Sequence, residues 1–179
     1  NIWTNNIYKK KEKKLIESIS LTVFKNVVYI IDNLGKYYAL NLNSGKLIWI
    51  KQHEMPFISQ IKVFDNKIFA IDGNNILRCF SIIDGKEIWN VLTEPSFIKT
   101  NKKLSIVIDS NFVLISNTLG DIVKVNIKTG IVEWFLPTHN TLIPYTTNFL
   151  KTSDIVLENN SLYFSNNFSK LYSLNLETG

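Results

Sequence analysis

The side chains best suited to catalysis or metal binding are few and scattered along this sequence. The two histidines, His53 and His139, lie far apart, and neither has a cysteine or a second histidine beside it. Transition metals need several such ligands at short spacings or on facing elements. His53 and Glu54 would meet Asp72 only through a chance of folding. The sequence therefore predicts no metal site.

Motifs for nucleophilic catalysis and for nucleotide binding are also missing. The sequence has no nucleophile elbow, phosphate loop or dinucleotide fingerprint, and Gly73–Asn75 and Asn117–Gly120 are interpreted as hairpin turns. Cys79 is the single cysteine, so no intrachain disulfide can form, and its place within a predicted strand indicates a buried structural thiol. We predict no catalytic residue, no cofactor-binding residue and no cofactor.

The strongest pattern in the sequence is a repeat. The segments Tyr38–Trp49, Phe80–Trp89 and Val125–Trp134 each contain a strand, a glycine turn and a second strand with tryptophan four residues after the glycine. A fourth copy, Leu174–Gly179, stops at its glycine, and successive glycines are 40, 45 and 49 residues apart. The repeat positions predicted to be structural are Trp3, Gly45, Trp49, Gly85, Trp89, Gly130, Trp134 and Gly179.

A repeat of this length built from strands is typical of a β-propeller, in which each repeat supplies one four-stranded blade. The glycines are predicted to lie in two-residue hairpin turns, such as Ser44-Gly45, because these turns need positive φ. The tryptophans are predicted on the outer strands, where their rings pack against a neighbouring blade instead of supporting a cofactor.

Short runs rich in Ile, Val, Leu and Tyr, bounded by Asn, Asp or Gly, predict strands throughout and no helix. The repeats extend over residues 1–8, 18–51, 57–92, 104–136 and 154–179. The first of these is expected to be only the outer strand of a preceding blade, and the last lacks its outer strand. We therefore predict an all-β protein with a single, partial β-propeller over residues 1–179, comprising about four antiparallel blades of a larger ring.

The net charge of +5 comes mostly from the run Lys9–Lys14. We interpret this run as a solvated loop and predict no nucleic-acid binding, because no stacking side chains are interleaved with it. No apolar run approaches the roughly 20 residues that a transmembrane helix needs. The longest crossover between blades, Pro137–Ser153, is expected to carry a partner-specific surface through Thr138-His139-Asn140, Tyr145 and Phe149.

The repeat resembles the PQQ-like, or quinoprotein-type, propeller repeat, whose pattern is Ala-x-Asp-x-x-Thr-Gly-x-x-x-Trp. The first copy matches it with Ala39, Asn41, Ser44, Gly45 and Trp49. Glycine and tryptophan hold in all three complete copies, whereas the Ala position becomes Cys79 and then Lys124. The resemblance covers essentially the whole chain, and it is more specific for fold than for function.

This resemblance implies two kinds of function. Quinone-dependent alcohol and sugar dehydrogenases of the family hold the quinone and calcium at the ring centre, and many carry adjacent cysteines, which this sequence lacks. A non-enzymatic branch provides an interaction platform in outer-membrane β-barrel assembly.

We predict a non-enzymatic scaffold for protein partners in the bacterial envelope, with the outer-membrane β-barrel assembly machinery as the expected partner. The family implies a periplasmic or outer-membrane-associated location, with any export signal or lipid anchor outside these 179 residues. Two alternatives stay open. One is part of a PQQ-dependent dehydrogenase whose active site lies in other blades, and the other is a ligand-binding or sensor ectodomain.

Overall fold

The computed structural model describes residues 2–94, 102–138, 153–165 and 171–177, which form four antiparallel sheets, here called blades 1 to 4. Blade 1 comprises β1 (Ile19–Phe24), β2 (Val27–Asp32), β3 (Lys36–Asn41) and β4 (Leu47–Gln52). Blade 2 comprises β5 (Lys62–Phe64), β6 (Lys67–Ile71), β7 (Ile76–Ser81) and β8 (Glu87–Leu92). Blade 3 comprises β9 (Ile106–Ile108), β10 (Phe112–Ser116), β11 (Ile122–Asn126) and β12 (Val132–Leu136). Blade 4 comprises β13 (Val156–Glu158), β14 (Ser161–Ser165) and β15 (Leu171–Asn175).

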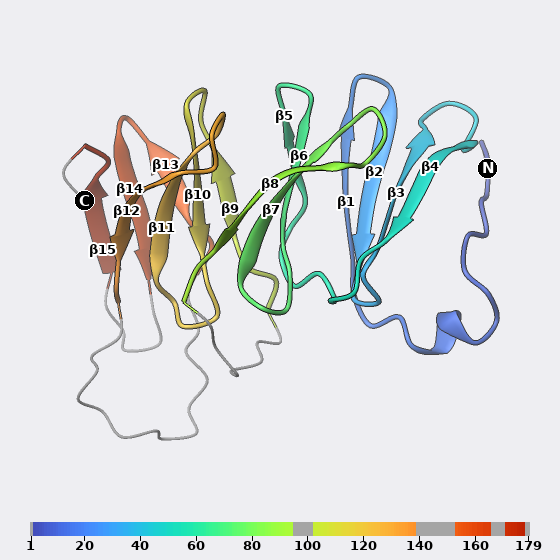
Figure 1. Cartoon of the computed structure of the whole chain (residues 1–179), viewed down its shortest axis with the longest axis horizontal. Helices are drawn as coiled ribbons and strands as arrows, with labels where there is room; N and C mark the ends of the chain where they lie inside the picture. The colour runs from blue at the N-terminus through green and yellow to red at the C-terminus, as the bar shows by residue number, and fades with distance from the viewer. Residues whose placement is uncertain (1, 95–101, 139–152, 166–170, 178–179) are drawn as a thin grey trace.

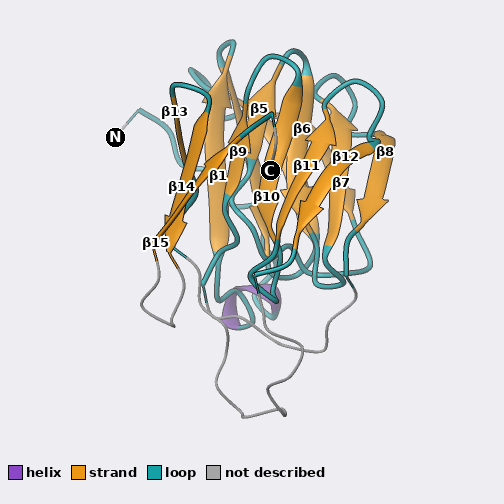
Figure 2. Cartoon of the chain, turned by 90° about the vertical axis from the view of Figure 1, so that its left-hand side faces the viewer, coloured by secondary structure: helices purple, strands orange, loops and turns teal. Residues whose placement is uncertain are grey.

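Each blade is a meander in which consecutive strands pair. The blades lie side by side in a row that does not close into a ring (Figure 1), and seen from its end the sheets stack one behind another (Figure 2). The first strands of successive blades are neighbours, because β5 contacts both β1 and β9. The prediction of an all-β propeller with several blades is confirmed. No helix among the described residues is long and apolar enough to cross a membrane.

The apolar cores lie between blades. One cluster joins blades 1 and 2, centred on side chains such as Tyr37 and Phe80, and a second joins blades 2 and 3, with Leu77 and Val125 among its members. A third joins blade 3 to Phe164 and other residues of blade 4. A single blade has no interior of its own, so each is stabilised by the neighbour against which it packs.

The turns divide into two types that the sequence analysis did not separate. The pairs Lys25-Asn26, Asp65-Asn66 and Asn159-Asn160 have positive φ at both residues and join the first two strands of their blades as two-residue turns. The prediction of two-residue turns at the repeat glycines is wrong.

In the first repeat, Gly45 N donates to Asn41 O, and Asn41 N donates to Lys46 O, which makes a four-residue loop. The loop is longer because the Asn41 side chain accepts the backbone N–H groups of Asn43 and Ser44, which holds an Asx turn before the glycine.

The N-terminal segment also differs from expectation. Residues 2–8 form no strand, although an outer strand was expected over 1–8; a strand needs a paired neighbour, and the described residues place none beside this segment. Trp3, Ile7 and Tyr8 pack instead on the open face of blade 1. The lysine run contains an unpredicted turn of 3-10 helix, η1 (Glu12–Lys14), held by an ion pair of 2.7 Å between Glu12 and Lys36.

Candidate functional site

Three of the repeat tryptophans each cover the glycine of the following blade. Trp3 lies over Gly45, and the rings of Trp49 and Trp89 lie over Gly85 and Gly130 in the same way. A Cβ atom built on these three glycines would come within 2.4 to 2.9 Å of the indole ring. Their φ angles are 65°, 68° and 73°, so glycine is required for backbone conformation and for the close approach of the ring. Gly179 lies outside the described residues.

The indole N–H groups follow the same spacing. Trp3 donates to Leu42 O at 2.8 Å and Trp49 donates to Ile82 O at 2.9 Å, and each acceptor lies three residues before the covered glycine. Trp134 donates at 3.2 Å to Leu176 O, the corresponding residue of the fourth copy. Trp89 Nε1 is buried without a hydrogen-bond partner among the described residues. The junction between blades 2 and 3 (the 2–3 junction) therefore departs from the repeat.

A row of buried polar side chains marks the turn between the second and third strands of blades 1 to 3. Asp32, Asp72 and Asn117 occupy the same position, and each uses Oδ1 to accept two backbone N–H groups of its own turn. These Asx turns satisfy the buried backbone and fix where the third strand begins. The blades differ in which side chains bind the other polar atom, Oδ2 of Asp32 and Asp72 or Nδ2 of Asn117.

In blade 1 the partners are tyrosines. Tyr8 OH donates to Asp32 Oδ2 at 2.8 Å and lies 3.1 Å from Tyr38 OH. Burial, followed by the hydrogen bonds to Tyr38 and Asp32, holds the pKa of Tyr8 well above its usual range. Both hydroxyl groups are therefore neutral in the folded protein at physiological pH.

In blade 2 the partners are charged and link it to blade 1 (the 1–2 junction). Asp72 is fully buried and accepts a 2.6 Å hydrogen bond from Arg78 Nε, while Arg78 Nη1 donates to Glu87 at 2.6 Å. His53, from the crossover after blade 1, places Nε2 3.1 Å from Asp72 Oδ2 and stacks on Phe57. His53 and Asp72 thus do meet, in a hydrogen-bond network that includes the Arg78–Asp72 ion pair. The described residues contain no group of three metal-ligating side chains.

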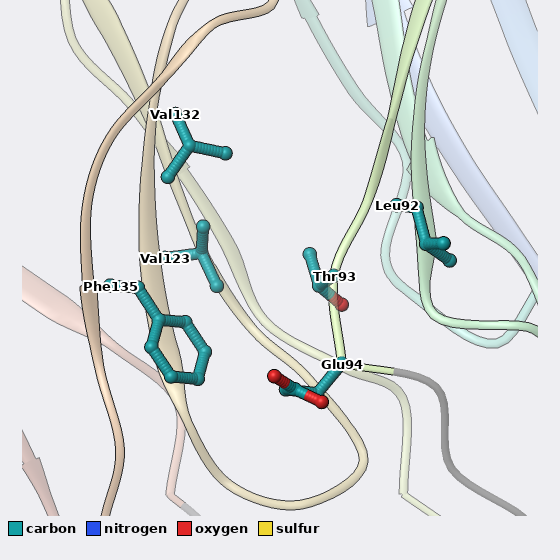
Figure 3. A pocket seen from close by; sticks show the side chains of 6 residues that line it. All are labelled: Leu92, Thr93, Glu94, Val123, Val132 and Phe135. Carbon is teal, nitrogen blue, oxygen red and sulfur yellow. The ribbon is translucent and has the colours of Figure 1, made fainter.

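At the 2–3 junction the corresponding space is an open cleft of about 270 Å³ (the 2–3 cleft). Leu92, the last residue of β8, forms one wall with Thr93 and Glu94, which follow it (Figure 3). The facing wall comprises Val123, Val132 and Phe135 of blade 3.

The cleft arises from three substitutions within the repeat. Counted from the repeat glycine, Val123 occupies the position of Arg78, Val132 that of Glu87, and Phe135 that of Asn90. The strand register agrees, because Arg78 pairs with Asn90 in blade 2 and Val123 pairs with Phe135 in blade 3. Val123 cannot fill the volume that the Arg78 side chain occupies, so the same backbone leaves a gap.

Asn75 connects Glu94, a residue that lines the cleft, to blade 3. It has φ of 60° at a turn position where blades 1 and 3 have Gly35 and Gly120. Its side chain donates to Glu94 O at 3.1 Å and to Thr118 Oγ1 at 2.7 Å, and it accepts from Thr118 N at 3.2 Å. Asn75 therefore links Glu94, in one wall of the cleft, to the blade 3 turn that precedes β11.

The prediction that Cys79 is buried is confirmed, and burial raises the pKa of its thiol to about 12. A thiol in this state is a poor nucleophile. His139, Asn140, Tyr145 and Phe149 of the long crossover lie outside the described residues.

Asn75, Glu94 and Thr118 were not predicted from the sequence to belong to a site. An alignment of the three turns that begin at Asp32, Asp72 and Asn117 carries a usable signal for the first of them: asparagine replaces glycine at the position of Asn75 only.

The whole chain, residues 1–179, matches the family model of the outer membrane protein assembly factor BamB. The chain belongs to this family. An uncharacterised protein of Rickettsia conorii is 25% identical over 189 residues, which cover 97% of this chain and 42% of that protein. The chain thus spans less than half the length of this curated relative.

Solved structures support the fold. The crystal structure of BamB from Moraxella catarrhalis superimposes with a TM-score of 0.77 and 17% identity, over 90% of this chain and 50% of that one. The quinohemoprotein alcohol dehydrogenase of Comamonas testosteroni also matches, with a TM-score of 0.54 and 17% identity over 65% of this chain and 20% of that one. At these identities the structural likeness shows the propeller fold only. It does not distinguish the dehydrogenase branch of the PQQ-like family from the non-enzymatic branch.

Proposed function

We propose that this chain is a non-enzymatic propeller scaffold that binds protein partners in the bacterial envelope and assists outer-membrane β-barrel assembly. The observation that carries the proposal is the match of the BamB family model along all 179 residues. Fold likeness alone would not distinguish a scaffold from a dehydrogenase.

The outer strands supply a physical basis for binding proteins. The strands β4, β8 and β12 end blades 1 to 3, and no other described strand pairs with their outer edges. They also expose apolar side chains, among them Ile48, Ile88 and Val132. Such edges accept an extended segment of another protein by strand addition, in which backbone hydrogen bonds supply affinity. An unfolded β-barrel precursor consists of segments of this kind.

The proposal is tested by binding between the purified protein and the purified periplasmic part of the membrane-embedded subunit of the same organism's barrel-assembly machinery. We expect saturable binding, measured by surface plasmon resonance, with a dissociation constant in the micromolar range, about −8 kcal/mol. Absence of binding to this subunit and to urea-unfolded barrel precursors would overturn the proposal.

The alternative function, part of a quinone-dependent dehydrogenase, is supported by the structural likeness to the alcohol dehydrogenase. It has a separate test. The protein is titrated with pyrroloquinoline quinone in a calorimeter, with and without calcium. Calcium-dependent, saturable heat would favour the enzyme. The absence of heat in both titrations leaves the scaffold as the better account.

A further inference from the structure

We propose that the 2–3 cleft binds an extended segment of a partner protein that presents a bulky apolar side chain and, two residues further on, a lysine or arginine. This inference rests on the proposed scaffold role, and it specifies which surface recognises the partner and by what chemistry. The cleft lies at the one blade junction among the described residues where a repeat tryptophan lacks its hydrogen-bond acceptor.

The shape of the cleft selects side chains. Its volume of about 270 Å³ lies below the roughly 300 to 1,000 Å³ of pockets that enclose drug-sized ligands. The space therefore suits one or two side chains of a peptide better than a cofactor. Leu92 and Phe135 are 61% and 39% exposed, so both present apolar surface that an incoming side chain would cover.

The charge at the cleft selects the neighbouring residue. The carboxylate of Glu94 lies at one end of the cleft, beyond the apolar walls (Figure 3). No described residue forms an ion pair with Glu94, whereas at the 1–2 junction Asp72 lies against Arg78 and His53, and Glu87 pairs with Arg78. In an extended strand, residues i and i+2 point to the same side about 7 Å apart. A basic residue two positions after the apolar one would thus reach Glu94.

The cleft is also preorganised. Asn75 joins the Glu94 backbone to Thr118 across the junction, and Thr93 Oγ1 donates to Asn75 O at 2.7 Å. These bonds tie the Thr93–Glu94 wall to the blade 3 turn at Thr118 before any partner arrives. Preorganisation of this kind lowers the entropic cost of binding.

The test uses the whole chain and a fluorescein-labelled peptide, Ser-Gly-Phe-Ser-Lys-Ser-Gly, in a fluorescence anisotropy titration. We expect saturable binding that weakens about tenfold or more for Phe135→Asn, which introduces the blade 2 residue at this position. Glu94→Gln should weaken binding about threefold at low salt, as for an exposed ion pair. Ile50→Asn, at the equivalent and equally exposed site of blade 1, is the matched control and should bind as the unmodified protein does.

Charge reversal separates recognition from any loss of folding. Glu94→Lys should reject the lysine peptide and prefer the same peptide with glutamate in place of lysine. The inference is overturned if the peptide shows no saturable binding up to about 1 mM, a free energy near −4 kcal/mol, or if Phe135→Asn binds it as well as the unmodified chain.

The peptide titration and the binding test with the membrane-embedded subunit can give different outcomes, so each proposal can be overturned separately. If the membrane-embedded subunit binds but the peptide does not, the cleft proposal is overturned and the scaffold role stands. If the peptide binds through Phe135 and Glu94 but the subunit and the unfolded precursors do not bind, the cleft is supported and its partner lies outside the assembly machinery.

Discussion

The 1–2 and 2–3 junctions share the strand and turn pattern of the repeat, but the first is lined by charged side chains and the second by apolar ones. At the 1–2 junction, Arg78 fills the space beside the fully buried Asp72 and connects it to Glu87. At the 2–3 junction, Val123 stands where Arg78 would be, and a cleft remains. The repeat fixes strands, turns and the packing of tryptophan on glycine, and it leaves the positions that face the preceding blade free to vary. A repeat protein can therefore open a site at one junction without altering its scaffold.

The largest predicted difference between the junctions concerns their tryptophans. Trp49→Ala should lower the free energy of unfolding by about 4–5 kcal/mol, because it removes a large packed ring, its contacts with Tyr29 and Tyr37 and the hydrogen bond to Ile82 O. Trp89→Ala should cost about 1 kcal/mol less, since Trp89 Nε1 is already without a partner. Urea denaturation of both variants measures the two values. Equal costs would contradict the predicted weakness at the 2–3 junction.

The Asx turns give the second comparison. Asp72→Ala should destabilise the protein by about 3 kcal/mol, because two backbone N–H groups and the buried part of Arg78 lose their acceptor. Asn117→Ala removes the neutral equivalent in blade 3 and should cost about 1–2 kcal/mol. Thermal unfolding followed by circular dichroism would show the order, and a larger loss for Asn117→Ala would contradict the view that the charged junction is the more strongly coupled one.

Much of the fold, and little of the candidate site, could be predicted from the sequence. Strands are predictable because each short apolar run, such as the one in Val27–Asp32, is bounded by turn residues of its own. The cleft depends on Glu94 and Phe135, which lie on different blades, so no local pattern reveals it. The glycine loop was predicted too short because the position of the glycine alone does not set the loop length. The Asn41 side chain sets it by accepting hydrogen bonds from the backbone of Asn43 and Ser44.

The third prediction tests the hydrogen bonds by which Asn75 connects Glu94 to Thr118 across the 2–3 junction. Asn75→Gly keeps a residue that tolerates positive φ, and Gly35 occupies the equivalent place in blade 1, so the backbone should be unaffected. The variant loses the hydrogen bonds to Glu94 O and Thr118 and should cost about 1–2 kcal/mol. Urea denaturation measures that loss. An unchanged midpoint would mean that Asn75 does not hold the 2–3 junction together.

The smallest effect is a pH dependence located at the 2–3 junction. Cys79 belongs to the core shared by blades 2 and 3, and burial raises the pKa of its thiol to about 12 in the folded protein. In the unfolded chain a cysteine titrates near about 8.5. Below that pH both states hold the proton and Cys79 adds no pH dependence. Above it the unfolded chain ionises first, so the free energy of unfolding falls until the folded pKa is reached.

The expected loss attributable to Cys79 between pH 9 and 10 is about 1 kcal/mol. Cys79→Ala should remove this part of the slope, which is measured by urea denaturation at closely spaced pH values. Burial also raises the pKa values of Tyr29, Tyr37 and Tyr38 in blade 1, so the variant keeps the alkaline instability that arises there. A slope unchanged by Cys79→Ala would mean that the alkaline instability arises elsewhere and that the core beside the cleft takes up water more readily than its burial indicates.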